Sequence, residues 1–221
     1  MKIDYRPEID GLRAIAVISV ILFHLQININ GYQFFRGGYI GVDIFFVISG
    51  YLISSIIFKE LFKTGNFSFL KFYERRIRRI LPVLIFVIII SMPIAWLYLY
   101  PNSLVDFSKS ILSSLGFISN HYFHYSANAY AAESSLLLPF LHTWSLSIEE
   151  QFYIIFPITI FLIFKYFKNY LIHIIIFVLF ISLFIAEWAS WNYPVANFYF
   201  LPTRVWELLA GSMLAYIDTI N

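Results

Sequence analysis

The sequence predicts an all-α, polytopic membrane protein. Of its 221 residues, 60% are hydrophobic and 21% are aromatic, whereas only 13% are charged. The apolar residues come in long blocks, unlike the pattern of an ordinary soluble domain. These blocks do not alternate between polar and apolar residues, as the strands of a membrane β-barrel would. The chain has no cysteine, which excludes disulfides, thiolate metal sites and thiol nucleophiles.

Six apolar blocks are expected to form spans, because each approaches the roughly twenty residues that cross a bilayer. They cover residues 11–27, 39–58, 80–100, 143–164, 170–188 and 204–217, the last being short. The first is interpreted as a retained span, since no small-residue cleavage pattern of a signal peptide follows it. Pro82 falls in the first turn of the third span, where proline is tolerated, and Pro93 is expected to kink that span. A mildly amphipathic piece, 103–117, lies in the mostly polar segment 101–142.

The distribution of Lys and Arg predicts the orientation of the spans. With a cytoplasmic N-terminus, the inner side holds twelve of the 15 basic residues, and the outer side holds Arg36, Lys109 and Arg204. Basic residues concentrate on the cytoplasmic side of membrane proteins, so the N-terminus is predicted to be cytoplasmic. Arg13 then lies at the inner mouth of the first span, and His24 lies in the outer half of the membrane.

Arg13 and His24 are predicted to share one face of the first span. Eleven helical steps come to roughly three turns, which places the two residues about 16 Å apart along the axis. Ionisable groups inside a membrane are costly and are usually functional. His24 is a candidate general base, because histidine exchanges protons near neutral pH and a nearby carboxylate could orient its ring. The alternative is a histidine whose hydrogen bonds are satisfied by a neighbouring helix.

Four carboxylates are expected within two turns of the outer ends of their spans, on the order of 5–10 Å deep and at a level comparable with His24. They are Asp43, Glu149, Glu150 and Glu207. Glu149 and Glu150 point about 100° apart on a helix, so they do not both avoid lipid by chance. Glu149 and Glu150 are catalytic candidates beside His24, one of them acting on the histidine or on a substrate hydroxyl, and Asp43 is a further catalytic candidate in the same outer half. The alternative for the adjacent glutamates is an interfacial turn in which both contact water.

A cationic rim is expected on the inner side. It comprises Arg13, Arg75, Arg76, Arg78 and Arg79. Guanidinium groups bind phosphates through paired hydrogen bonds, so this rim is a candidate phosphate site. The alternative is that these residues obey the positive-inside rule and contact anionic lipid head groups.

Other motifs carry little functional signal. His121, His124 and His142 are spaced poorly for a metal site, and no metal is predicted. Phosphate-binding glycine loops, zinc-binding HExxH and the nucleophile elbow are all missing from the sequence. The small residues Gly37, Gly38, Gly41 and Gly50 have the spacing of close helix packing. Nothing in the sequence indicates a nucleic-acid partner.

At several of these stretches the sequence resembles a known family, the acyltransferase-3 group of integral membrane acyltransferases, which includes O-antigen and peptidoglycan O-acetylases. The matching stretches are YRPEIDGLRA at 5–14, the Arg-x10-His pair Arg13 and His24, GGYIGVDIFFVISGY at 37–51, FYERRIRRILP at 72–82, HTWSLSIEEQFY at 142–153 and LPTRVWELLAG at 201–211. They follow one another along nearly the whole chain. The sequences of these stretches are most similar to those of the bacterial subgroup that carries a C-terminal SGNH-type domain.

The resemblance implies a membrane O-acyltransferase in the bacterial inner membrane. Its donor would be acyl-CoA, typically acetyl-CoA, presented from the cytoplasm, and no cofactor would be held permanently. Arg13 and the Arg-x-x-Arg pairs of 75–79 would engage the coenzyme A phosphates, and His24 would act as a base or transient acyl carrier. The acceptor would be a hydroxyl of a cell-envelope polysaccharide such as peptidoglycan or lipopolysaccharide, outside the membrane. Asp43, Glu149 and Glu150 match recurrent acidic positions of the family.

The sequence departs from the family in length. Members have about ten spans, often followed by the SGNH-type domain, so residues 1–221 are expected to be a partial acyltransferase-3 domain that lacks the spans after the sixth. A missing C-terminal portion or an SGNH-type partner is implied. Two rival hypotheses remain: a carrier that moves lipid-linked sugars or acyl units without chemistry, and an inactive truncated remnant.

Overall fold

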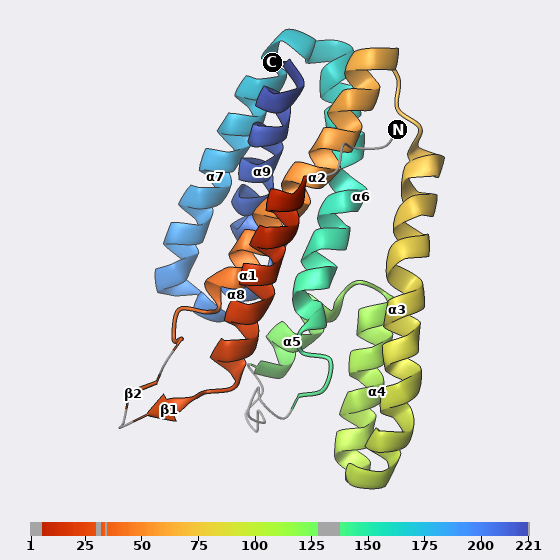
Figure 1. Ribbon diagram of the computed structural model, residues 1–221, viewed down its shortest axis with the longest axis vertical. Helices are drawn as coiled ribbons and strands as arrows, with labels where there is room; N and C mark the ends of the chain where they lie inside the picture. Colours follow the sequence, from red (N-terminus) through yellow and green to blue (C-terminus); the bar gives the residue numbers. More distant parts are fainter. Residues whose placement is uncertain (1–5, 30–31, 34, 128–137, 221) are drawn as a thin grey trace. The chain divides into compact units, whose positions relative to one another are not determined.

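The computed structural model describes residues 6–29, 32–33, 35–127 and 138–220, and these are almost entirely helical (Figure 1). The helices are α1 Pro7–His24, α2 Ile40–Thr64, α3 Phe69–Tyr98, α4 Pro101–Leu115, α5 Ser119–Ala127, α6 Thr143–Phe167, α7 Leu171–Asn192, α8 Pro194–Tyr199 and α9 Leu201–Ile220. A 3₁₀ turn, Lys168–Tyr170, joins α6 to α7. The two-residue strands β1 Asn28–Ile29 and β2 Tyr32–Gln33 form one short antiparallel pair. The predicted helical class is confirmed.

Three stretches of the described chain are long and apolar enough to cross a membrane: Ile40–Thr64, Phe69–Tyr98 and Thr143–Asn192. The last of these contains α6, the 3₁₀ turn and α7. α1 falls outside this group because its first two turns carry Glu8, Asp10 and Arg13. The membrane character of the chain is therefore supported, whereas the count of six spans stays a prediction.

Helix α3 begins well before the predicted third span. It starts at Phe69 and runs for 30 residues, so the arginine-rich stretch is helical. Arg, Lys and Glu are good helix formers, and Arg78 pairs with Glu74 one turn earlier at 2.9 Å. The expectation that Pro82 occupies a first helical turn is consequently wrong, because both Pro82 and Pro93 lie inside α3. The amphipathic piece expected near 103–117 is confirmed as α4.

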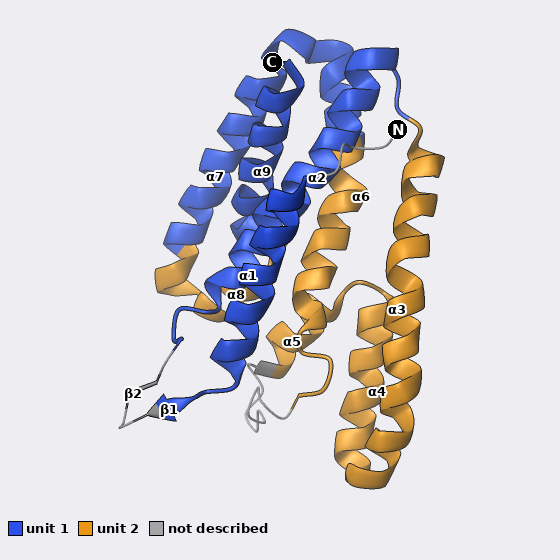
Figure 2. Ribbon diagram, viewed as in Figure 1, with its two compact units in different colours: residues 1–67, 158–188, 202–221 blue, residues 68–157, 189–201 orange. Residues whose placement is uncertain are grey.

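The chain divides into two compact units (Figure 2). Unit 1 comprises residues 1–67, 158–188 and 202–221, and unit 2 comprises residues 68–157 and 189–201. Unit 1 thus holds α1, α2, the end of α6, most of α7 and nearly all of α9. Unit 2 holds α3, α4, α5, the first part of α6 and α8.

In unit 1, small residues let helices approach closely. α1 and α2 run antiparallel, since Gly38 meets Ser19 and Phe23 while Gly41 meets Ala16. Any Cβ added at either glycine would overlap the backbone of α1. This confirms that these glycines are packing positions, as their spacing predicts.

The α2–α9 pair of unit 1 runs parallel, because Asp43 contacts Arg204 near the start of both helices and Ser54 contacts Ser212 farther along both. Gly50 meets the backbone of Leu208, and Gly211 meets that of Val47. A little farther along, the buried hydroxyls of Ser54 and Ser212 are hydrogen-bonded at 2.7 Å. Parallel helices need a long connection, and here the other helices of the chain supply it.

In unit 2, α3 runs antiparallel to α6. The Tyr73 hydroxyl donates to the carbonyl oxygens of Tyr153 and Ile154 at 3.3 and 3.2 Å. At the other end of the pair, residues 80–87 of α3 and 140–146 around the start of α6 line one cavity.

A buried polar stripe marks one face of α6 in unit 2. Thr143, Ser147 and Gln151 follow one another at four-residue spacing. Thr143 and Ser147 are hydrogen-bonded to the Ser119 hydroxyl at 2.9 and 2.7 Å, and Gln151 donates to Asn120 at 2.9 Å. Because buried polar groups are costly when unpaired, this network fixes the first part of α6 against α5.

Candidate functional site

His24 is the last residue of α1, and its ring is exposed. The Nδ1 atom lies 2.8 Å from the backbone carbonyl oxygen of Val20, one turn earlier. A carbonyl can only accept, so we assign the ring proton to Nδ1, which leaves the lone pair on Nε2. The ring is thus oriented by its own helix, rather than by the carboxylate that the sequence suggests. In the neutral tautomer with this bond, Nε2 carries the lone pair that a general base uses.

Arg13 lies on the same continuous helix as His24, which supports the predicted spacing of about 16 Å along the axis. Its guanidinium group approaches the Asp10 carboxylate at 3.5 Å, and its side chain is 32% exposed. This contact is a weak surface pair, so it leaves most of the guanidinium donors available to an anion.

Asp43 belongs to a charged cluster between α2 and α9 in unit 1. Arg204 Nη2 donates to Asp43 Oδ1, and Arg204 Nη1 lies 3.2 Å from Glu207 Oε1. The guanidinium group also stands over the Phe46 ring, 5.4 Å from its centroid. The Glu207 side chain is only 1% exposed. One arginine therefore neutralises two carboxylates, of which Glu207 is buried and Asp43 is half-buried.

The structure does not bring Asp43 to the level of His24. Asp43 follows Gly41, which packs on Ala16, whereas His24 lies two turns farther along the antiparallel α1. The offset along the helix pair is about 12 Å. Among the described contacts, the partner of Asp43 is Arg204.

The adjacent glutamates have different surroundings in unit 2. Glu149 accepts a hydrogen bond from the Tyr153 hydroxyl at 3.1 Å. Glu150 is buried, 8% exposed, and its Oε1 has no hydrogen-bond partner within the described ranges. The prediction that the two point in different directions is consistent with these contacts. An unpaired buried carboxylate oxygen is costly, so Glu150 is a candidate for a role beyond packing.

The four arginines of α3 also differ in how exposed they are. Arg76 is half-buried, with its guanidinium group over the rings of Phe72 and Tyr153 at 5.8 and 5.7 Å. Such stacking holds a cation by its attraction to the ring faces. Arg75, Arg78 and Arg79 are exposed. Arg76 therefore anchors α3 on α6, and the three exposed residues are the ones able to meet an anion.

Arg79 also lines a cavity of about 320 Å³ in unit 2. The opposite wall includes His142 and Leu146, and the remaining lining is mostly aliphatic. The cavity therefore combines the guanidinium group of Arg79 with a mostly apolar lining between α3 and the start of α6.

Two sets of residues escaped the sequence reasoning. Arg204 was assigned only to the outer loops, although its spacing of three from Glu207 in an apolar helix is the signal of an internal ion pair. The second set links Arg6, Tyr51 and Asp218: the Tyr51 hydroxyl donates to Asp218 at 2.6 Å, and Arg6 pairs with the same carboxylate at 2.8 Å. No local pattern predicts contacts across so many residues.

The candidate residues are distributed over both units. Arg13, His24 and Asp43 belong to unit 1, whereas Glu149, Glu150 and the four arginines of α3 belong to unit 2. Within the described ranges, no three side chains of His, Asp or Glu gather in a way that could hold a metal ion.

Comparison with known proteins decides the family. A model of the acyltransferase-3 family, described as an acyltransferase domain, matches residues 6–220. The chain belongs to this acyltransferase-3 family. The resemblance noted in the sequence is thereby confirmed over almost its full length.

Relatives of the acyltransferase-3 chain include two named proteins. It is 36% identical over 222 residues to the peptidoglycan O-acetyltransferase OatA of Listeria monocytogenes, covering 98% of this chain. It is 34% identical over 218 residues to the O-acetyltransferase OatA of Staphylococcus aureus, covering 96% of this chain. In both cases the match covers 35% of the relative, so the chain spans about a third of the length of these proteins. No solved structure was found to match it.

Proposed function

We propose that this chain carries the donor-binding residues and the base of a membrane O-acyltransferase. The enzyme would transfer an acyl group, in the first place acetyl, from cytoplasmic acyl-CoA to a hydroxyl of an extracytoplasmic cell-surface polysaccharide. The family and the names of its relatives support an O-acyl transfer. Because those relatives are much longer, the proposal is for this chain together with a further C-terminal portion or an SGNH-type partner.

The observation that carries the proposal is the hydrogen bond between His24 Nδ1 and the Val20 carbonyl. It leaves Nε2 as the atom that takes the proton of the attacking sugar hydroxyl. The hydroxyl oxygen then forms a bond to the thioester carbonyl carbon, the carbon–sulfur bond breaks, and coenzyme A leaves as a thiolate that gains a proton. Once protonated, His24 is stabilised at the C-terminus of α1, because the helix dipole favours a cation there.

The donor side of the proposal rests on Arg13, Arg75, Arg78 and Arg79. The last three are exposed and Arg13 is half-buried, which leaves all four accessible to the phosphates of acyl-CoA. The stacked Arg76 positions the helix that carries three of them. Arginine matches phosphate oxygens through two parallel hydrogen bonds, which is the recognition that a nucleotide-containing donor needs.

The proposed topology has six spans and a cytoplasmic N-terminus in the bacterial inner membrane. Alternating spans require the second and sixth to run parallel and the first to oppose the second. Inside unit 1, the contacts Asp43–Arg204 and Ser54–Ser212 make α2 and α9 parallel, and α1 runs antiparallel to α2, in agreement with this order. In unit 2 the antiparallel pair of α3 and α6 agrees with a third and a fourth span.

The experiment that tests the function is mass spectrometry of surface glycans from chromosomal mutants. We expect the acetyl increment to disappear in the His24→Ala strain and in a deletion. It should persist in a His173→Ala strain, because His173 is an exposed histidine of α7 with no proposed role. Membrane levels of each variant are measured by immunoblot, so that loss of protein is not mistaken for loss of chemistry.

Two outcomes contradict the proposal. If the glycans of the deletion strain keep every acyl group, the chain does not serve O-acylation. If the His24→Ala strain carries as much glycan acylation as the parent strain, His24 is not the base, and a carrier without chemistry becomes the better account.

A further inference from the structure

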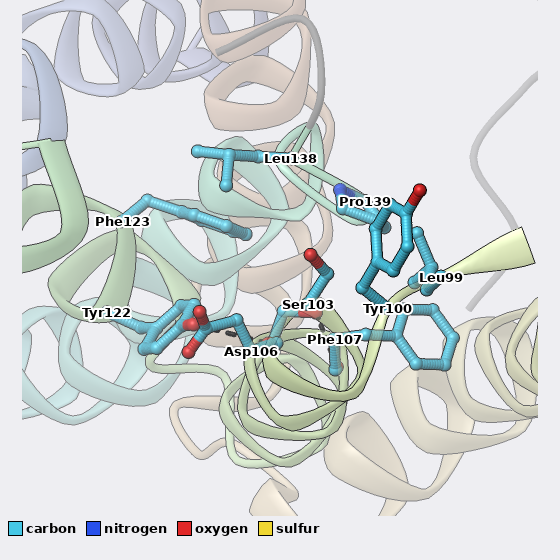
Figure 3. Close-up of a pocket in the computed structure, with 10 residues that line it drawn as sticks. Leu99, Tyr100, Ser103, Asp106, Phe107, Tyr122, Phe123, Leu138 and Pro139 are labelled. Atoms are coloured by element: carbon cyan, nitrogen blue, oxygen red, sulfur yellow. Dashed lines mark hydrogen bonds between the residues drawn. The ribbon is translucent and has the colours of Figure 1, made fainter. Parts of the chain in front are cut away.

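A cavity of about 260 Å³ lies at the end of α3, between α4, α5 and the residues before α6 (Figure 3). All its lining residues belong to unit 2. Four aromatic rings line it: those of Tyr100, Phe107, Tyr122 and Phe123. Tyr100 is 82% exposed, so packing does not require its ring at that place.

Polar groups are mixed with these rings. The hydroxyl of Ser103 points into the space between the rings of Tyr100 and Phe123 (Figure 3). It makes no hydrogen bond with the part of the chain that the structure describes. Asp106 uses Oδ1 for Lys109 at 3.0 Å, which leaves Oδ2 without a protein donor in the same ranges. The backbone oxygen of Asp106 accepts from the Tyr122 hydroxyl at 3.2 Å, and this bond fixes the ring that forms one wall.

The composition of the cavity matches the chemistry of a sugar. A pyranose ring has C–H faces that pack on aromatic rings, and its edge carries hydroxyls that need acceptors such as a carboxylate or a serine oxygen. The volume is below the roughly 300–1,000 Å³ of sites for drug-sized ligands, which suits one monosaccharide unit. A carboxylate at the cavity disfavours an anionic phosphate, so the same site fits a phospholipid head group poorly.

We propose that this cavity is a subsite for a neutral pyranose unit of the acceptor glycan, with Tyr100 as the stacking platform and Asp106 and Ser103 as hydrogen-bonding groups. The inference rests on the proposed function, because the segment 101–142 lies on the extracytoplasmic side in the proposed topology. Its role is to hold the polysaccharide strand, and the proton transfer remains with His24.

Direct binding tests the subsite without turnover. The full-length protein in phosphatidylcholine nanodiscs is titrated with chitotetraose, a neutral N-acetylglucosamine tetramer, and binding is followed by calorimetry and saturation-transfer NMR. Tyr100→Ala and Asp106→Asn are each expected to weaken binding about tenfold, the size of one aromatic or charged contact. Tyr98→Ala is the matched control, because Tyr98 is 80% exposed two residues earlier and does not line the cavity. Ser103→Ala is also expected to weaken binding, and Ser108→Ala is its matched control, because Ser108 does not line the cavity.

Acetyl transfer measured in parallel separates the two proposals. If the unaltered protein transfers acetyl groups while Tyr100→Ala and Asp106→Asn bind chitotetraose as it does, the subsite is wrong and the function stands. If binding weakens as expected but no variant or parent transfers an acyl group, the subsite stands and the function fails. Failure of the parent to bind chitotetraose overturns the subsite. Loss of co-purified phospholipid from Tyr100→Ala, with glycan binding unchanged, also overturns it by making the cavity a lipid site.

Discussion

Glu207 in unit 1 and Glu150 in unit 2 are both buried carboxylates near an arginine, but their surroundings differ. In unit 1, Glu207 is 1% exposed and lies 3.2 Å from Arg204, which also binds Asp43. In unit 2, Glu150 is 8% exposed, and its Oε1 has no hydrogen-bond partner among the described residues. The nearby Arg76 stands instead over two aromatic rings.

The difference separates a structural cluster from a reactive one. Opposite charges neutralise one another between α2 and α9, and they hold those helices in register. Glu150 Oε1 and both Oε atoms of Glu207 lack a hydrogen-bond partner among the described residues, but Glu207 lies at ion-pair distance from Arg204. The Arg76 guanidinium stands over aromatic rings instead, so the Glu150 carboxylate is the one we expect to accept from a substrate donor. We therefore expect substitutions in the unit 1 cluster to lower stability, and the Glu150 substitution in unit 2 to lower activity first.

The largest effect is expected from Arg204→Met. Removing the guanidinium group leaves the buried Glu207 and the half-buried Asp43 without their cation, which costs about 3–5 kcal/mol in unfolding free energy. Thermal unfolding in detergent micelles, followed by circular dichroism, measures the change. Arg78→Met is the control, since Arg78 is a surface partner of Glu74 with a side chain 77% exposed. If the two variants have equal unfolding midpoints, the Arg204 cluster contributes no more to stability than the surface pair of Arg78 and Glu74.

Close packing of α2 on α9 gives the next effect. A Cβ at Gly211 would overlap the backbone at Val47 and Tyr51, so Gly211→Ala is expected to cost about 1–3 kcal/mol. Gly37→Ala meets nothing within 4 Å and should leave the unfolding midpoint unchanged. A Gly211→Ala protein as stable as the parent would mean that the two helices do not approach so closely.

Glu150→Gln is expected to act on turnover rather than on stability. The amide has the same shape, and no described hydrogen bond of Oε1 is lost, so the unfolding midpoint should stay near that of the parent. Acyl transfer should fall about tenfold if the carboxylate accepts a bond from the substrate, equivalent to about 1.4 kcal/mol. Glu187→Gln, at an exposed carboxylate of α7, serves as the control. If the rate of acyl transfer is unchanged in Glu150→Gln, Glu150 contributes only to packing.

The smallest effect concerns pH. The hydrogen bond from Tyr51, aided by Arg6, holds the pKa of Asp218 below its ordinary value of 3.8. The folded state therefore favours the ionised form, and the stability this contributes is present above that ordinary value and is lost as pH falls through the folded pKa. Because the Asp218 side chain is 41% exposed, water screens the pair and the contribution is small. Asp218→Asn should flatten the fall in midpoint below about pH 4, and an unaltered slope would rule the contact out as a source of pH dependence.

Much of the helical order followed from the sequence, because apolar blocks of span length have few alternatives. The blocks at 39–58, 143–164 and 170–188 correspond to α2, α6 and α7, which begin within one residue of the predicted starts and end three to six residues later than predicted. The third span is predicted to begin at residue 80, where the apolar block begins, whereas α3 begins at Phe69 within the charged stretch before it. On a helix the charged side chains of that stretch reach solvent while the backbone bonds remain intact, and Phe72 on the opposite face is buried.

The candidate site was only partly accessible to sequence reasoning. Residues such as Arg13 and His24 share one helix, so their spacing could be worked out locally. The bond from Arg204 to Asp43 joins residues 161 positions apart, and it depends on a parallel helix pair that no local pattern specifies. The bond from His24 to the Val20 carbonyl is also not specified by the sequence, because the rotamer of a histidine at a helix end can turn its ring to the preceding turn or to another group.

The central claim, that His24 Nε2 is the base for acyl transfer, is tested most directly by turnover of the His24→Ala enzyme. Transfer from labelled acetyl-CoA to glycan is measured in membrane vesicles and divided by the amount of folded protein. A general base contributes about 10²–10⁴-fold, so we expect a loss of at least about a hundredfold with the unfolding midpoint unchanged. A His24→Ala enzyme that keeps half or more of the parental rate would contradict the account.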